Sequence, residues 1–235
     1  MPKRKKTAVK TPTFSVVPFH CEDKDYDNAP VEEHPLSMPA NARIVCCAMP
    51  GRGKSSLAKN VLCRGGYERV FVAHGGGDTS HEYSLVDHEP INFMENTPDW
   101  FMEQSRECNG GRMILICDDI NMQDLSREEK GNLYRVCQYV CTHAPMTLLV
   151  TGHTWVQIIP RVRRLCDVVC IWPPDGGADQ ISYIARSLGV NRGTLGRAFS
   201  KCKTKFDFVM RDLNGPEYGR AMWRINVCED FDAGA

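Results

Sequence analysis

The segment that most constrains this chain is residues 48–56, which read AMPGRGKSS. It follows the apolar run ARIVCCA, which predicts a buried strand, and it leads into SSLAKNVL, which predicts a helix. A strand, a turn of small residues and a Lys-Ser pair at a helix start form the context of a P-loop. In such a turn, backbone N–H groups and the helix N-terminus surround phosphate oxygens. The segment therefore predicts a phosphate-binding turn between a core strand and a helix.

Two residues of this segment have a specific expected role in nucleotide binding. Lys54 is expected to reach the β- and γ-phosphates of ATP, and the Ser55 hydroxyl to bind Mg²⁺. Ala48 stands where the pattern GxxxxGKS has its first glycine, and alanine is small enough for that turn. A chance glycine-rich turn is the alternative. The expected nucleotide-binding residues are Met49, Pro50, Gly51, Arg52, Gly53, Lys54, Ser55 and Ser56.

Two adjacent acids follow the apolar run MILIC, namely Asp118 and Asp119. Burying two carboxylates at a strand end is unfavourable unless a cation or a catalytic role compensates. In a P-loop enzyme the first acid holds Mg²⁺ and the second can polarise the attacking water, so we assign Asp118 to the metal and Asp119 to the base. The alternative is that both acids only begin the following loop.

A third polar strand end is TLLVTGH, which closes with Thr151, Gly152 and His153. Thr151 and His153 are expected near the γ-phosphate, although a plain loop histidine is an equal alternative. Arg163 and Arg164 come after Pro160, and one of them could stabilise transition-state charge in a neighbouring subunit's site. A solvated basic turn is the alternative. The predicted catalytic set is Lys54, Asp119, His153, Arg163 and Arg164.

Short apolar runs alternate with helical stretches from residue 42 onward. Strands are expected at 42–48, 69–74, 112–117, 146–151, 167–172 and 206–210, and helices near 54–63, 98–108, 126–142 and 178–202. Continuous apolar runs such as ILIC and TLLV suit a sheet that is buried on both faces. The alternation predicts an α/β fold, a P-loop NTPase with a RecA-like, mainly parallel sheet between helices.

The amino-acid composition excludes several classes of protein. The 235 residues are 42% hydrophobic and 25% charged, which excludes a disordered, collagenous or membrane protein. No apolar run approaches the ~20 residues of a membrane span, and no apolar stretch follows the basic start, so we expect neither a membrane span nor secretion. The 12 cysteines lack C-x-x-C spacing, and we interpret most as reduced and buried. Cys137, Cys141 and His143 have a metal-like spacing, but core packing is the favoured interpretation.

The net charge of zero hides an uneven distribution. We expect a flexible arm over 1–40, basic and then acidic, a P-loop ATPase domain over 41–228 and a short acidic tail over 229–235. The basic cluster at residues 3–6, from Lys3 to Lys6, is open to three interpretations: a nuclear import signal, a phosphate contact or a solvated tail.

A second basic stretch covers residues 186–207. Its basic side chains suit a polyanion as partner. A motor that binds the phosphate backbone of DNA does not need a particular nucleotide sequence. Residues 180–199 are also spaced like a helix-turn-helix, although packing of these helices on the sheet is the favoured interpretation. The expected DNA contacts are Arg192, Arg197, Lys201 and Lys203.

The segments AMPGRGKSS, MILICDD and TLLVTGHTW…IPRVRRLCDVVCIW, in this order, resemble the viral DNA-packaging ATPases of the FtsK–HerA superfamily, with the poxvirus-type group the most similar. The resemblance covers about residues 42–212 and includes FDFVMRDLN, which is similar to the terminal strand of that family. It implies a ring, usually a hexamer, that hydrolyses ATP and pumps double-stranded DNA into a preformed capsid. It also implies capsid or vertex partners and a place in the virion or the infected cell.

Carried over by motif, Lys54 and Ser55 match the phosphate and Mg²⁺ residues, and Asp118 and Asp119 match the acidic motif. The family usually has a Ser-Gln or similar pair where this chain has Thr151, Gly152 and His153. The alternatives are another P-loop enzyme, such as a nucleotide kinase or GTPase, and a non-motor DNA- or capsid-binding protein that retains a P-loop.

Overall fold

The computed structural model describes residues 36, 38–39, 41–75, 83–84, 86–214, 216, 222–227 and 229–230. The basic cluster at residues 3–6 and most of the predicted arm and tail therefore lie outside the described residues. Leu36 and Met38 fall within the range predicted for the arm, and both are fully buried in the core. Packing into the domain thus includes residues before 41.

The centre of the fold is a nine-stranded sheet, counted over the described residues, in the order β3-β2-β4-β5-β1-β6-β7-β8-β9. Pairing is parallel from β3 to β6 and antiparallel from β6 to β9. The strands are β1 (Arg43–Cys47), β2 (Arg69–His74), β3 (Glu89–Pro90), β4 (Met113–Asp118), β5 (Met146–Gly152), β6 (Val168–Ile171), β7 (Val209–Asp212), β8 (Trp223–Ile225) and β9 (Glu229–Asp230).

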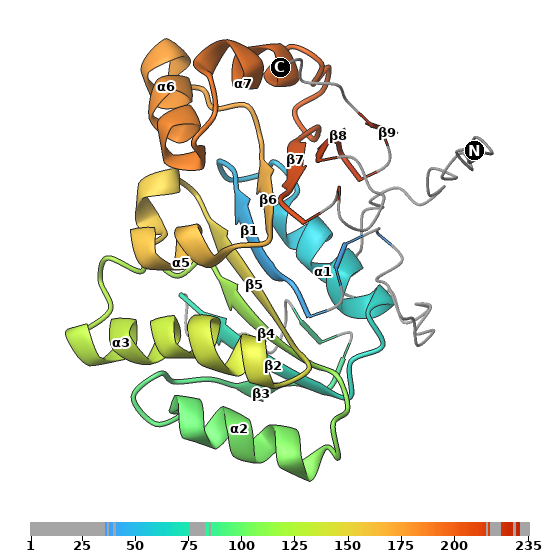
Figure 1. Ribbon diagram of the computed structural model, residues 1–235, viewed down its shortest axis with the longest axis vertical. Coiled ribbons are helices and arrows are strands. Elements are labelled where there is room, and N and C mark those ends of the chain that lie inside the picture. The colour runs from blue at the N-terminus through green and yellow to red at the C-terminus, as the bar shows by residue number, and fades with distance from the viewer. Residues whose placement is uncertain are drawn as a thin grey trace, which may run out of the picture.

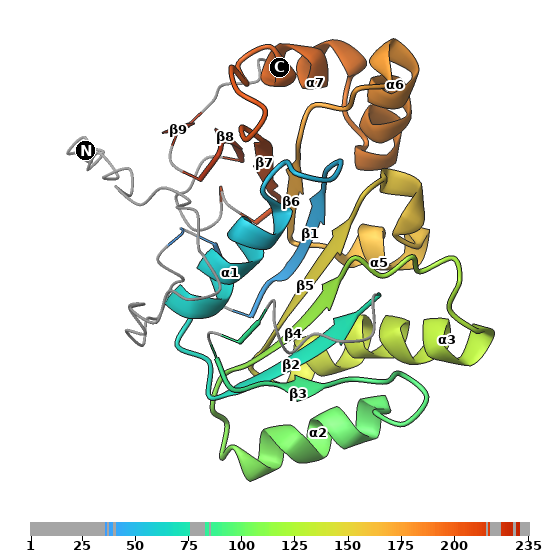
Figure 2. The same ribbon diagram turned by 180° about the vertical axis from the view of Figure 1, so that it is seen from behind.

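Helices cover both faces of the sheet, with α1 on one face and α2, α3 and α5 on the other (Figure 1, and Figure 2 from behind). Local signals fix several ends: Thr97 caps α2, which begins at Pro98, and Ser126 forms a capping box with Glu129 at the start of α3. The helices are α1 (Lys54–Arg64), α2 (Pro98–Glu107), α3 (Arg127–Arg135), the π-helix η1 (Val136–Val140), α4 (Cys141–His143), the 3₁₀ turn η2 (Trp155–Gln157), α5 (Pro160–Leu165), α6 (Gly177–Leu188) and α7 (Arg192–Phe199).

Two hydrophobic clusters hold these layers together, because successive side chains of a strand point to opposite faces. In β4, Ile114 and Ile116 pack in the cluster that contains Leu57 of α1. Leu115, between them, packs in the cluster that contains Phe101 of α2. Each fully buried side chain of this kind contributes about 1.5–3 kcal/mol. The α/β fold with a mainly parallel sheet between helices is therefore confirmed.

Two element boundaries differ from the expected ones. The helical stretch expected near 178–202 is divided, because Gly189 ends α6 with φ 65° and Asn191 caps α7. The strand expected at 206–210 begins only at Val209, because the Asp207 carboxylate accepts hydrogen bonds from the backbone N–H groups of Lys203 and Thr204 and folds that segment into a turn.

The helices α6 and α7 pack on the domain. Ile184 and Ala185 of α6 and Leu195 and Phe199 of α7 are buried in the same cluster as the β-sheet residues. This arrangement fits the expectation that the two helices cover the sheet. Within the described residues, no helix combines the length and the apolar character that crossing a bilayer requires.

The cysteines among the described residues are all free thiols, and most are buried. Burial raises the pKa of both Cys47 and Cys137 to about 12, so these thiols stay protonated at neutral pH. Cys137 and Cys141 lie in the core, and no group of three or more His, Cys, Asp or Glu side chains in the described part of the chain could hold a metal ion. The core interpretation of these cysteines is supported.

Candidate functional site

The predicted phosphate-binding turn follows β1, which lies between β5 and β6 in the sheet. Gly51 and Gly53 have φ values of 70° and 96°, in the left-handed region that favours glycine. The turn is fixed on both sides: the Ala48 N–H donates to the Gly152 carbonyl, and the Gly53 carbonyl accepts from Leu57 N–H at the start of α1. The sequence thus folds into a strand, a glycine turn and a helix N-terminus, which is the arrangement of a P-loop.

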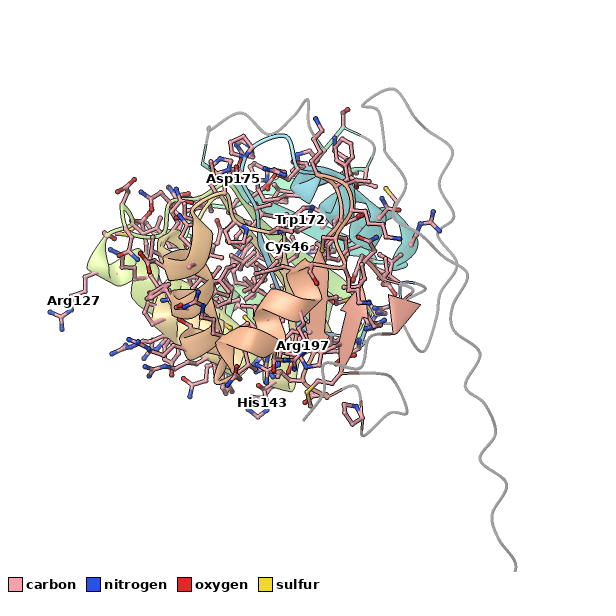
Figure 3. The ribbon with its side chains drawn as sticks, turned by 90° about the horizontal axis from the view of Figure 1, so that it is seen from above. Cys46, Arg127, His143, Trp172, Asp175 and Arg197 are labelled. Carbon is pink, nitrogen blue, oxygen red and sulfur yellow. The ribbon has the colours of Figure 1, made fainter. Side chains whose placement is uncertain are left out.

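The residues of this turn differ in exposure. Lys54, the first residue of α1, is only 5% exposed. Met49, Pro50 and Gly51 are exposed, and Ser55 and Ser56 are half-buried. Arg52 points to the other side of the turn, where its Nη2 pairs with Asp175 Oδ1 at 2.5 Å. Figure 3 labels Asp175 and Trp172 in the same part of the view, near Cys46 of β1.

The carboxylate of Asp118 is buried at the end of β4 and is held by two hydroxyl groups. Thr151 of β5 donates to Asp118 Oδ1, and the Tyr83 hydroxyl donates to Oδ2 at 2.7 Å. Thr151 Oγ1 also accepts the Asp119 N–H at 3.0 Å. The two hydroxyls compensate for the burial of this carboxylate and fix its orientation.

Asp119 turns away from the core toward Lys54, and its side chain is 34% exposed. Its Oδ1 lies 3.7 Å from Lys54 Nζ, and its Oδ2 lies 3.4 Å from His153 Nε2. Lys54 Nζ in turn lies 3.1 Å from His153 Nδ1. Three residues that follow three different strands therefore meet at one point, because parallel strands place their carboxyl ends at one edge of the sheet.

The backbone at Asp119 is unusual, since its φ is 52°. Only a few per cent of non-glycine residues have a positive φ, and asparagine and aspartate are the most tolerant of it. Gly75, after β2, lies against this backbone: a Cβ added to Gly75 would sit 2.2 Å from the Asp119 carbonyl oxygen. Gly75 therefore leaves the space that this conformation of Asp119 needs.

Tyr83 and Gly75 were not singled out in the sequence. Both follow β2, and neither lies in a motif that marks a site. The parallel register of β2 and β4, which pairs His74 with Asp118, brings this part of the chain to the acidic strand end. Only knowledge of that register could have identified them.

The two arginines of α5 differ in their surroundings. The Arg163 guanidinium lies 5.2 Å from the ring centre of Trp155 and 5.9 Å from that of Tyr183, all within one chain. Its Nη2 also reaches the Tyr183 hydroxyl at 3.5 Å. Arg164 is exposed. Arg163 thus packs against aromatic rings of the same chain, whereas Arg164 is accessible.

The predicted DNA contacts come from the C-terminal half of the described residues. They belong to α7 and the segment that follows it, and Figure 3 shows Arg197 away from Asp175. All of the four expected contacts are exposed: Arg192, Arg197, Lys201 and Lys203.

Fold and site together define a class: a P-loop NTPase fold with an acidic strand end beside the phosphate turn. No family model and no curated protein matches the sequence. Among solved structures, the chain is similar to the genome packaging NTPase B204 of Sulfolobus turreted icosahedral virus 2 in complex with ATP-gammaS, with a TM-score of 0.54 and 15% identity over 80% of this chain and 98% of that chain.

Two further structures show the same fold. B204, the DNA-packaging ATPase of Sulfolobus turreted icosahedral virus, has a TM-score of 0.56 and 15% identity over 83% of this chain and 100% of that one. The pCW3 conjugation coupling protein TcpA, in its monomer form with ATPgS, has a TM-score of 0.55 and 13% identity over 82% of this chain and 61% of that one. The predicted resemblance to packaging ATPases is confirmed at the level of the fold.

We predict that Gly75→Ala lowers nucleoside triphosphate hydrolysis by on the order of 100-fold, because the new Cβ pushes the Asp119 backbone out of position. Turnover under saturating nucleotide measures the effect. The matched control is Gly131→Ala in α3, where a Cβ meets nothing within 4 Å. The control should keep its turnover and gain about 1 kcal/mol in the free energy of unfolding. Equal turnover in the two variants would refute the role of Gly75.

Proposed function

We propose that this protein is an ATP-hydrolysing motor that translocates double-stranded viral DNA into a preformed capsid, in the virion or the infected cell. The observation that carries the proposal is the meeting of Lys54, Asp119 and His153 within 3.7 Å, beside the buried Asp118. A lysine at a phosphate turn and carboxylates that can hold Mg²⁺ and orient water are groups that P-loop NTPases use for hydrolysis, and the imidazole adds a further polar group at the same point. The similarity in fold to genome-packaging NTPases supports the same conclusion.

In this proposal each residue of the site has one task. Lys54 binds the β- and γ-phosphates, Asp119 orients and polarises the attacking water, and His153 senses the γ-phosphate. The Ser55 hydroxyl and the Asp118 carboxylate are oxygen ligands of the kind that Mg²⁺ prefers. Asp119 Oδ1 is buried without a hydrogen bond, which also fits a site that takes up a cation and water. Mg²⁺, when bound, neutralises charge on the phosphates.

We predict that Lys54→Ala abolishes ATP hydrolysis, because the phosphates lose their cation. Asp119→Asn should bind Mg·ATP normally but not hydrolyse it, whereas Asp118→Asn should weaken binding of the metal-bound nucleotide. Calorimetric titration with Mg·ATP and steady-state turnover separate the two effects. An equal loss of ATP affinity in both aspartate variants would contradict this division of roles.

We propose DNA as a partner because the lysine and arginine side chains of α7 and of the segment after it are exposed. Because such contacts release counterions from backbone phosphate, binding to duplex DNA should be independent of sequence and should weaken steeply with salt. We predict that neutralising Arg192, Arg197, Lys201 and Lys203 together lowers both the affinity and the salt slope. Fluorescence anisotropy over a series of salt concentrations measures both. A strong preference for one base sequence would instead support the helix-turn-helix interpretation.

The motor is proposed to work as a homo-oligomeric ring, a hexamer by the resemblance, with each nucleotide between two subunits. A cavity of about 630 Å³ adjoins Asp119 and also includes Asp124 and Glu129 in its lining. A cationic side chain of a neighbouring subunit would complement these acids. Arg164 is exposed and fits this task, whereas Arg163 is packed between Trp155 and Tyr183.

We predict that Arg164→Ala lowers kcat about 10³-fold or more and leaves ATP binding and assembly intact, because an arginine supplied in trans acts on the transition state. Mixing this variant with Lys54→Ala subunits should restore part of the activity, since some seams then pair an intact P-loop with an intact arginine. A mixture that stays inactive although mixed rings form, or an Arg164→Ala variant with normal turnover, would exclude the role in trans.

A further inference from the structure

One aromatic side chain lies beside the P-loop with no task in the proposed hydrolysis. Phe206 is 57% exposed, the highest value among the large hydrophobic side chains of the described residues. It lies close to the turn: a Cβ on Gly53 would be 3.8 Å from Phe206 Cδ1. Single exposed hydrophobic side chains are common on protein surfaces, so it is the position of this ring beside the phosphate turn that suggests a role.

The segment that carries Phe206 is held in place by several hydrogen bonds. The Trp172 indole N–H donates to the Phe206 carbonyl at 3.0 Å, and the Phe206 N–H donates to Thr204 Oγ1 at 3.2 Å. The next residue, Asp207, accepts from Asn226 Nδ2 at 3.2 Å as well as from the backbone of the turn before it. The ring is therefore presented by a fixed turn, which lowers the entropy lost when a ligand binds to it.

The order of the strands gives the direction in which a nucleotide must lie. Asp119 and His153, which mark the γ-phosphate end, follow β4 and β5 on one side of β1. The nucleoside end of a triphosphate chain in the same turn must then point to the other side of β1, toward β6 and β7. Phe206 stands on that side, in the segment just before β7.

We propose that Phe206 is the stacking platform for the base of the bound nucleotide. The inference rests on the proposed function, because it requires a nucleoside triphosphate in the P-loop. Lys205 Nζ lies 4.9 Å from the centre of the Phe206 ring, a cation–π distance, so the ammonium group restrains the ring and adds positive charge next to the phosphate turn. Stacking uses the π-face that every base has, so it does not separate adenine from guanine. The larger ring system of a purine gives it more stacking area than a pyrimidine.

Binding of ATP and of inorganic tripolyphosphate, both with Mg²⁺, tests the proposal, because tripolyphosphate has the phosphate chain but no base. Phe206→Ala should weaken ATP binding about 10- to 100-fold and leave tripolyphosphate binding unchanged. Phe206→Trp should retain ATP affinity, and ATP and GTP should bind the unmodified protein with similar Kd. The matched control is Tyr139→Ala in η1, which removes a ring that is 50% exposed and lies beside His143, and it should change neither ligand.

The outcomes separate the two proposals. If Phe206→Ala keeps full ATP affinity while Lys54→Ala loses both ligands, the platform is refuted and the nucleotide site stands. If Phe206→Ala weakens both ligands equally, the ring only shapes the P-loop, and the platform is again refuted. If the unmodified protein binds neither ligand, or Lys54→Ala keeps both, the proposed function itself fails.

Discussion

The candidate site depends on the hydrogen bonds of the Thr151 hydroxyl, which links the ends of β4 and β5. It donates to the Asp118 carboxylate and accepts the backbone N–H of Asp119, so a single side chain contacts both acids. His153 stands two residues further along the same chain, and its position relative to Asp119 follows from the same anchor. Because Thr151 and Asp118 are almost wholly buried, these hydrogen bonds are shielded from solvent and hold the geometry at this edge of the sheet.

Much of the fold could be predicted from the sequence because its strong signals are local. The P-loop turn and the apolar strands before Asp118 and His153 are continuous segments whose residue types determine their conformation. The weak elements were missed for the opposite reason: β3 has two residues, and β8 has three. Such short strands form only because the sheet edge supplies hydrogen-bonding partners, and no periodicity marks them in the sequence.

The sequence could propose a candidate site because its motifs are local, and what it did not single out has the same cause as the missed strands. Asp119 and His153, which lie near Lys54, could be proposed from the sequence because each follows an apolar strand and has a side chain suited to phosphate chemistry. Gly75 and Tyr83 could not, since a glycine that leaves space and a tyrosine that holds a carboxylate act only through register. The turn at Asp207 also moved Phe206 from an expected strand to the surface beside the P-loop.

The place of β1 in the sheet has a consequence for how the chain reaches this structure. Arg43 pairs with Leu148, and Ile44 pairs with Val168, so both neighbours of β1 come from segments far later in the sequence. During synthesis, the strand that leads into the P-loop emerges from the ribosome long before either partner exists, and its apolar residues have no sheet to join. Non-local pairing of this kind slows folding and prolongs exposure to aggregation. The nucleotide turn is thus encoded early in the chain but can be completed only after β6 has been made.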